Sequence, residues 1–187
     1  VAHRPHRCAS SIPPRTGQEI IAMIKLHTNL GVITLELDHA CAPATAANFL
    51  QYVEDGFYEG TLFHRVIPNF MIQGGGLKPD MSQKPGRPSI RNEADNGLKN
   101  RIGTVAMART ADPHSATSQF FINLKNNDFL DYRSSTSQGW GYCVFGQVVD
   151  GMDVVEAIAK VATTSRRGHQ DVPVENVIIE KTEVVGE

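Results

Sequence analysis

The sequence has few cysteines, no long apolar run and almost no excess of charge. Its 187 residues include three cysteines, Cys8, Cys41 and Cys143. An odd number without CxxC spacing fits neither a disulfide framework nor a zinc site, and reduced thiols are the simplest interpretation. No segment approaches the roughly 20 apolar residues that a membrane-spanning helix needs. The 18 Lys and Arg nearly balance the 20 Asp and Glu, which disfavours nucleic acid or a membrane as a partner.

The first 22 residues also lack an apolar stretch of the roughly 7 to 15 residues that a secretory signal requires. We expect the natural chain to begin at Met23, and we interpret residues 1–22 as an N-terminal extension, either foreign to the natural chain or disordered. The alternative is a remnant of a targeting segment. Residues 23–187 are then expected to form one domain, because the content of 41% hydrophobic and 20% charged residues is typical of a globular protein.

Hydrophobic periodicity predicts a mainly β domain. Residues 24–28 and 32–38 alternate around a turn that contains Gly31, which indicates a β-hairpin. Pro43 suits the first turn of a helix that ends near Gly56, and 152–161 has a second helical pattern. Further strands are predicted at 63–67, 70–73, 103–108, 119–124, 143–149 and 177–185. About eight short strands and two helices predict an antiparallel sheet closed on itself, with the helices over its open ends. Residues 77–100 and 131–140 are predicted to be long loops, functional or mobile.

Three patterns that usually attract a functional interpretation are weak here. The glycine run 74–76 fits neither GxGxxG nor GxxxxGK[ST], and no helical pattern follows it. The histidines stand singly, without HxH or HExxH spacing, so we expect no metal site. His114 and Ser115 follow Asp112, but neighbours in sequence do not make a catalytic triad, and the GxSxG turn is missing. A nucleotide-binding protein, a metalloenzyme and a serine hydrolase are therefore disfavoured.

The segment 63–75, FHRVIPNFMIQGG, is more informative. Arg65 and Gln73 are an even number of residues apart, but Pro68 and Asn69 interrupt the pattern, so parity does not put them on one face. Phe70 and Met71 could simply be core residues. At this segment the chain resembles the cyclophilin family of peptidyl-prolyl cis/trans isomerases, and the likeness continues through GTVAMA at 103–108, SQFFI at 118–122 and VFGQV at 144–148. It covers roughly residues 23–185 and is strongest to the short cytosolic bacterial cyclophilins.

The resemblance implies an eight-stranded antiparallel β-barrel capped by two α-helices. It also implies a catalytic arginine at Arg65 and a substrate-anchoring glutamine at Gln73. The implied proline pocket is Phe70, Met71, Phe121 and Leu130 with Phe129 on the rim, and the implied groove for the residues before proline is Ala108, Arg109 and Gln119. Three positions depart from many relatives: Phe129 replaces Trp, Tyr142 replaces His and Arg109 replaces Asn. These departures bear on ligand preference and not on the reaction, because Arg65 is retained.

The implied activity is rotation about X-Pro bonds in peptides and in unfolded or folding proteins, without a cofactor. Arg65 is expected to stabilise the twisted amide. The alternative is a proline-peptide-binding chaperone with little turnover, which would be expected to have lost this arginine. The resemblance also implies cyclosporin as an inhibitor, and we expect it to bind weakly because Phe129 has no hydrogen-bond donor. We expect a monomeric, cytoplasmic protein.

Overall fold

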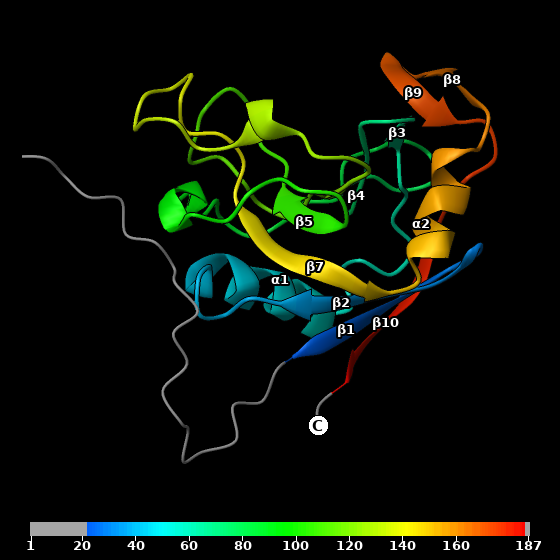
Figure 1. Ribbon diagram of the computed structural model, residues 1–187. Helices are drawn as coiled ribbons and strands as arrows, with labels where there is room; N and C mark the ends of the chain where they lie inside the picture. The colour runs from blue at the N-terminus through cyan, green and yellow to red at the C-terminus, as the bar shows by residue number, and fades with distance from the viewer. Residues whose placement is uncertain (1–21, 186–187) are drawn as a thin grey trace, which may run out of the picture.

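The computed structural model describes residues 22–185, so the interpretation of residues 1–21 as an extension lies outside the described residues (Figure 1). Most of the fold is one eight-stranded sheet, in the order β10-β1-β2-β7-β5-β6-β4-β3, with every neighbouring pair antiparallel. Its strands are β1 (Met23–Thr28), β2 (Gly31–Leu37), β3 (Arg65–Ile67), β4 (Met71–Gly74), β5 (Thr104–Met107), β6 (Phe120–Asn123), β7 (Val144–Asp150) and β10 (Ile179–Val185). The predicted mainly β fold with an antiparallel sheet is confirmed.

The two outer strands of this sheet, β3 and β10, are linked through the segment that precedes β3. The backbone N–H of Phe63 donates to the carbonyl of Val177 at 2.9 Å, and that of Ile179 donates to Thr61 at 2.9 Å. An isolated antiparallel bridge between Leu62 and Ile178 lies between them. These contacts close the curled sheet, which removes most of its free edge.

Two α-helices cover the sheet, as predicted. The first, α1 (Pro43–Glu54), has Pro43 in its first turn, where a missing N–H costs nothing, and it buries Ala46, Phe49 and Val53 along one face. It contacts β7 and β10, whereas α2 (Met152–Ala159) contacts β2, β3 and β4. Figure 1 shows the two helices on different sides of the curled sheet.

One pair of strands was not predicted. A separate hairpin of β8 (Thr163–Arg166) and β9 (His169–Pro173) packs against β3. Most of its residues up to Gln170 are exposed and polar, so the sequence has no alternation of apolar side chains there to indicate a strand. Two short 3₁₀ turns, Ala94–Asn96 and Asp128–Leu130, complete the secondary structure of the described residues.

Alternate side chains of the central strands belong to two different apolar clusters. Phe120 and Ile122 of β6 are in the main core inside the sheet, while Phe121 between them joins a second cluster with Met71 and Leu130. Because successive side chains of a strand point to opposite faces, this second cluster lies on the outer face of the sheet. The outer face of β4, β5 and β6 is therefore partly apolar, and it is available for a site.

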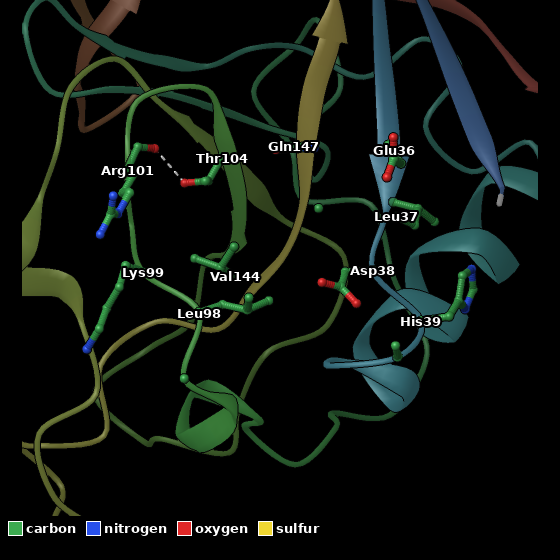
Figure 2. Close-up of a pocket in the computed structure, with 13 residues that line it drawn as sticks. Glu36, Leu37, Asp38, His39, Leu98, Lys99, Arg101, Thr104, Val144 and Gln147 are labelled. Atoms are coloured by element: carbon green, nitrogen blue, oxygen red, sulfur yellow. Dashed lines mark hydrogen bonds between the residues drawn. The ribbon is translucent and has the colours of Figure 1, made fainter. Parts of the chain in front are cut away.

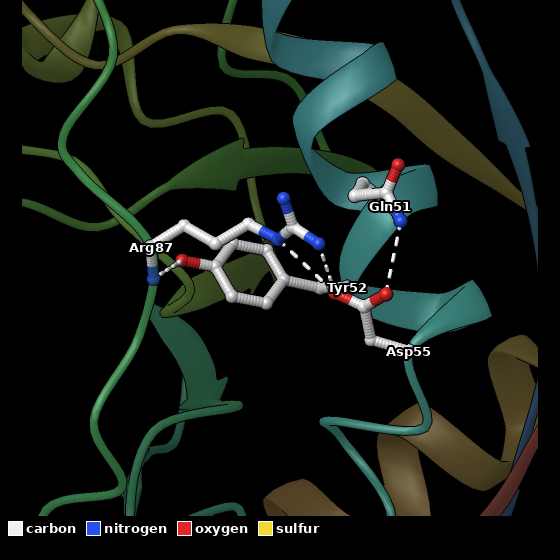
Figure 3. A network of polar contacts seen from close by, with 4 residues as sticks. All are labelled: Gln51, Tyr52, Asp55 and Arg87. Carbon is white, nitrogen blue, oxygen red and sulfur yellow. Dashed lines mark hydrogen bonds and ion pairs between the residues drawn. The ribbon is translucent and has the colours of Figure 1, made fainter.

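The predicted loop at 77–100 is tied to α1 by a polar network (Figure 3). The backbone N–H of Arg87 donates to the Tyr52 hydroxyl at 2.7 Å, and its guanidinium donates to the Asp55 carboxylate. Gln51 donates to the same carboxylate at 2.9 Å. The hydrogen bond from Arg87 is the main reason why the pKa of Asp55 lies below its ordinary value. The loop is thus anchored in its middle, although it has little regular structure.

The cysteines differ from the sequence-based expectation. Cys143 is buried with a free thiol, and burial raises its pKa to about 12. Cys41 is disulfide-bonded, so the expectation of reduced thiols is wrong at that residue. Within residues 22–185, no helix is long and apolar enough to cross a membrane.

Candidate functional site

Arg65, Gln73 and Gln119 form a row of polar side chains on the outer face of the sheet. Arg65 of β3 and Gln73 of β4 are direct cross-strand partners. The Nη1 atom of Arg65 lies 3.5 Å from Oε1 of Gln73, and Nε2 of Gln73 donates to Oε1 of Gln119 at 3.0 Å. The exposed guanidinium of Arg65 keeps most of its donors for a ligand, while the amide of Gln73 is held in one orientation.

A small cavity, which we call the apolar cavity, lies beside this row. Its volume is about 130 Å³. Met71, Phe121 and Leu130 are buried in it and Phe70 is partly buried, so these four residues form a hydrocarbon floor, while Arg65, Gln73 and Arg109 make the rest of the lining polar. It brings together nine residues of the predicted site: Arg65, Phe70, Met71, Gln73, Ala108, Arg109, Phe121, Leu130 and Tyr142. The strands and the Asp128–Leu130 turn that supply them are distant in sequence, and only the closed sheet makes them neighbours.

The other two predicted site residues lie just outside the apolar cavity. Gln119 contacts it through Gln73, as described above. Phe129 is 61% exposed, and its ring lies 5.7 Å from that of Phe70. Trp140, the one tryptophan of the chain, does not contribute its ring to this rim. It is buried against the rings of Tyr132 and His114.

Arg109 and Tyr142 form one side of the apolar cavity as a stacked pair. The guanidinium carbon of Arg109 lies 4.5 Å from the centre of the Tyr142 ring. Nε and Nη2 of Arg109 also donate to the Gly141 carbonyl, at 3.1 and 2.9 Å. Most donors of Arg109 are therefore already used, and its role in this structure is to hold the cavity side. Arg109 thus places a fixed cation on this side of the cavity.

A buried network of asparagines fixes the backbone around the apolar cavity. Asn127 donates from Nδ2 to the carbonyl of Phe70 at 2.9 Å, and Asn100 donates to that of Leu130 at 3.2 Å. Asn123 joins the two, through bonds of 3.1 Å to Asn100 and 2.8 Å to Asn127. Sequence reasoning missed these positioning residues because isolated asparagines in loops give no periodic signal. Amides in a buried network are restricted to one geometry, which holds Phe70 and Leu130 in place.

A second cavity, which we call the polar cavity, adjoins the apolar cavity and shares Arg65 and Gln73 with it. Its volume is about 450 Å³. The β8–β9 hairpin and the loop 77–83 supply most of its other walls. It is lined by His64, Arg65, Gln73, Leu77, Met81, Gln83, Gln119 and residues 168–171. Except for Arg65, Gln73 and Gln119, sequence reasoning did not assign these residues to the site.

His64 is buried next to Arg65 and stays neutral near neutral pH. The pKa of its imidazole is lowered to about 4, mainly by burial and to a smaller extent by the nearby His169 and Arg65. The ring centres of His64 and His169 are 6.2 Å apart. His64 therefore has no proton to exchange between about pH 6 and 9.

The patterns judged weak in the sequence have structural explanations. A Cβ atom added at Gly76 would lie 2.4 Å from Cγ of Gln119, so this glycine allows close packing beside the site. Nδ1 of His114 accepts from the backbone of Asn92 at 3.0 Å, while Oγ of Ser115 donates to the Asp112 carbonyl at 2.7 Å. This histidine and serine do not form a nucleophile and base. Within residues 22–185 there is no group of three or more His, Cys, Asp or Glu side chains suited to a metal ion.

A larger cavity of about 660 Å³ lies elsewhere, near the end of β2 (Figure 2). Lys99 and Arg101 lie on one side of it, and Asp38 and His39 on the other. None of the predicted site residues lines it. We favour the smaller apolar cavity as the site because an exposed cation, ordered amides and an apolar pocket converge there.

Comparisons with known proteins agree with the fold described above. A family model described as cyclophilin type peptidyl-prolyl cis-trans isomerase/CLD matches residues 23–184. The chain is 60% identical over 166 residues to peptidyl-prolyl cis-trans isomerase cyp18 of Streptomyces antibioticus, covering 89% of this chain and 100% of that protein. It is 58% identical over 162 residues to peptidyl-prolyl cis-trans isomerase B of Escherichia coli, covering 87% and 99%.

Similar structures include a crystal structure of a cyclophilin type peptidyl-prolyl cis-trans isomerase of Cryptosporidium parvum. It has a TM-score of 0.76 and 26% sequence identity, and covers 90% of this chain and 99% of that chain. A second structure of that protein, in the presence of the dipeptide Ala-Pro, has a TM-score of 0.75 and 27% identity, and covers 88% and 99%.

Proposed function

The chain belongs to the cyclophilin-type peptidyl-prolyl cis-trans isomerases, and from this premise we propose that Arg65 is its catalytic residue and that the apolar cavity holds the substrate proline. The isomerase activity follows from the family. The residue roles rest on the geometry of the site.

The observation that carries the proposal is an exposed guanidinium at the edge of a small apolar cavity. The volume of about 130 Å³ corresponds to roughly four water molecules at liquid density. Such a cavity suits one small side chain such as a proline ring, held by Phe70, Met71, Phe121 and Leu130. Arg65 can then reach the amide that joins the proline to the preceding residue.

Arg65 can lower the barrier because the amide changes during rotation. Resonance gives the X-Pro bond a barrier of about 18 to 20 kcal/mol. As the C–N bond twists, the prolyl nitrogen becomes pyramidal and regains a lone pair. A donor aimed at this nitrogen then binds the twisted state more strongly than the planar one, which is the condition for catalysis. Arginine suits this role because it stays protonated and has a rigid array of donors.

Arg65 is not expected to supply the whole acceleration. A turnover on the order of 10³ s⁻¹, against about 10⁻² s⁻¹ without enzyme, requires about 7 kcal/mol. One hydrogen bond to a charged group contributes about 1.5–3 kcal/mol. The apolar walls remove water from the amide, and Gln73, held by Gln119, keeps the peptide in place. Desolvation and fixed geometry are therefore assigned the remainder.

The substrates that we propose are proline-containing peptides and proline segments of unfolded or folding proteins. We assign the residues before the proline to the groove at Ala108, Arg109 and Gln119, with Tyr142 on its side and Phe129 on its rim. Weak cyclosporin binding, a monomeric state and a cytoplasmic location also stay predictions.

A protease-coupled assay with a fluorogenic Ala-Pro peptide tests this proposal. The cis-to-trans phase should accelerate in proportion to enzyme concentration, and a proline peptide that the protease cannot cut should inhibit competitively. Binding of the peptide without any acceleration would instead indicate the chaperone with little turnover, and would contradict the role of Arg65.

A further inference from the structure

The cavity near the end of β2, which we call the β2 cavity, lies on the outer face of the sheet and takes no part in the proposed reaction. Glu36 of β2 and Gln147 of β7 are cross-strand partners, and Gln147 is also the partner of Thr104 of β5. Partners across antiparallel strands share a face, so these three residues form a polar row in the lining of the cavity. Leu37, next to Glu36, is in the main core, so the row faces outward.

The walls of the β2 cavity carry charges of opposite sign. Lys99 and Arg101 lie on the loop side, and Asp38 lies across from them at the end of β2, two residues after Glu36 (Figure 2). Within residues 22–185, the side chains of Glu36, Lys99 and Arg101 form no ion pair and no hydrogen bond. Oδ1 of Asp38 accepts from the backbone N–H of Cys41 at 2.9 Å. The charges of both walls are therefore not consumed by contacts with each other.

The size and lining of the β2 cavity suit a small zwitterion. Its volume of about 660 Å³ is within the roughly 300–1,000 Å³ that is usual for small-molecule sites. Figure 2 shows the apolar side chains of Leu98 and Val144 between the two charged walls. The two acidic and two basic side chains cancel in formal charge, so neither a simple anion nor a simple cation is favoured. A dipeptide with free termini has an ammonium, a carboxylate and a short apolar body, and so matches this lining.

The apolar part of this lining is shared with the cluster under the apolar cavity. Val144 is buried in one cluster with Met71, Phe121 and Leu130, and Leu98 packs against the same cluster. Met71, Phe121 and Leu130 line the apolar cavity, whereas Val144 and Leu98 line the β2 cavity. A ligand that restricts Leu98 therefore also restricts the packing of the apolar cavity.

The loop 97–101 connects the two cavities a second time, through Asn100. The charged residues on both sides of Asn100 line the β2 cavity, but Asn100 itself is buried and does not. Its Nδ2 donates to the carbonyls of Leu130 and Tyr142, each at 3.2 Å, and both of these residues line the apolar cavity. A ligand that orders this loop would therefore stabilise the observed shape of the apolar cavity, and a second ligand would bind there at a lower entropic cost.

We propose that the β2 cavity is a binding site for a small zwitterion of about the size of a dipeptide, with its ammonium at Glu36 and Asp38 and its carboxylate at Lys99 and Arg101. Its occupancy raises the affinity of the apolar cavity for proline peptides. This second effect rests on the proposed function, because it takes the apolar cavity as the proline site, whereas binding of the zwitterion does not depend on it.

NMR titrations of the full chain with three forms of one dipeptide test the site. The probes are Ala-Leu with free termini, acetyl-Ala-Leu, which lacks the ammonium, and Ala-Leu amide, which lacks the carboxylate. Ala-Leu should shift the amide signals of Gly97 and Gly146 with a Kd on the order of 1 mM, and each blocked form should bind about 2- to 10-fold more weakly. Equal affinities for the three forms, or no shift of these signals, would overturn the site.

Variants that remove one charge test the orientation of the ligand. Glu36→Gln should weaken binding of Ala-Leu by about 2- to 10-fold without weakening that of acetyl-Ala-Leu, and Lys99→Gln should weaken Ala-Leu without weakening Ala-Leu amide. Glu156→Gln and Lys160→Gln, which remove exposed charges near the end of α2, are the matched controls and should leave the affinities unchanged. If the wall variants behave like the controls, the assigned charge contacts are wrong.

The effect on the apolar cavity is measured with acetyl-Ala-Ala-Pro-Ala amide. Saturating Ala-Leu should raise the affinity for this peptide by about fivefold, at the low end of allosteric coupling, and the peptide should raise the affinity for Ala-Leu by the same factor. An unchanged or lowered affinity would overturn the coupling between the cavities. Isomerisation of the proline peptide without Ala-Leu does not involve the β2 cavity, so its absence would instead contradict the proposed function.

Discussion

Arg65 and Gln73 are paired across the β3–β4 hairpin, with Nη1 of the arginine 3.5 Å from Oε1 of the glutamine. The pairing depends on the turn between the strands. The N–H of Phe70 donates to the carbonyl of Ile67 at 3.1 Å, and Asn69 has a φ of 60°. Pro68 followed by a residue with positive φ is the pattern of a type II turn, which brings the two strands back in this register. The register puts both side chains on the outer face.

Replacing Arg65 with Ala should reduce kcat/KM by about 10²- to 10³-fold, which corresponds to the loss of a transition-state donor worth roughly 2.7–4 kcal/mol. The fold should persist because the Arg65 side chain is exposed. The coupled peptide assay and circular dichroism check the two parts. Arg65→Lys should recover only part of the activity, since a lysine lacks the rigid array of donors. More than about a third of the activity in a folded Arg65→Ala protein would end the electrostatic role proposed for this residue.

The activity should be nearly independent of pH from about 6 to 9, because no proposed step moves a proton and arginine titrates far above this range. His64, the histidine next to Arg65, has a pKa of about 4 because of its burial, and so does not titrate there. Measurements of kcat/KM across this range, with the coupling protease controlled, check the expectation. A bell-shaped profile would implicate an acid or base that the mechanism omits, with Tyr142 and the histidines as the first candidates.

The free energy of unfolding should decrease as the pH falls from about 6.5 to 4. Burial lowers the pKa of His64 from 6.5 to about 4, so within this range the unfolded chain binds a proton that the folded protein does not. The unfolded state is then favoured, by up to about 3 kcal/mol at the acid end. Above about pH 6.5 the imidazole is neutral in both states, and the effect disappears.

Urea unfolding of the unmodified protein and of His64→Gln at pH 4.5 and 7.5 measures this contribution. The variant should lose less stability than the unmodified protein between the two values, by about 2 to 3 kcal/mol. If the variant does not fold, NMR titration of the His64 ring in the unmodified protein gives the same information. Equal losses in both proteins, or a ring that titrates near pH 6.5, would show that burial does not control this histidine.

Cyclosporin should inhibit weakly, and Phe129→Trp should raise its affinity by at least about fivefold. Phe129 is 61% exposed at the rim, and its ring has no donor, whereas an indole N–H at this position can donate to a carbonyl of the drug. An unpaired carbonyl costs about 1–3 kcal/mol, or roughly 5- to 150-fold in affinity. Inhibition titrations on both proteins decide the matter. Nanomolar inhibition of the unmodified protein, or no gain from Trp, would show that position 129 does not set the affinity.

The sequence predicts the elements whose side chains alternate or repeat. The β1–β2 hairpin and both helices lie close to the predicted ranges, because their buried residues follow periods of two and of about 3.6. The residues at 63–67 are only partly a strand: β3 begins at Arg65, because Phe63 instead bonds to the segment before β10. The polar β8–β9 hairpin has no such period and was missed.

For the candidate site, the sequence by itself determined the residue types and the family, since the FHRVIPNFMIQGG segment contains Arg65, Phe70, Met71 and Gln73 within a short stretch. Only the tertiary structure decided that Arg65 and Gln73 share a face, because that depends on the turn at Pro68 and Asn69 and on the register it sets. The convergence of Ala108, Phe121, Leu130 and Tyr142, and the polar cavity under β9, arise from closure of the sheet. Contacts between segments so distant in sequence depend on packing, and no local pattern encodes them.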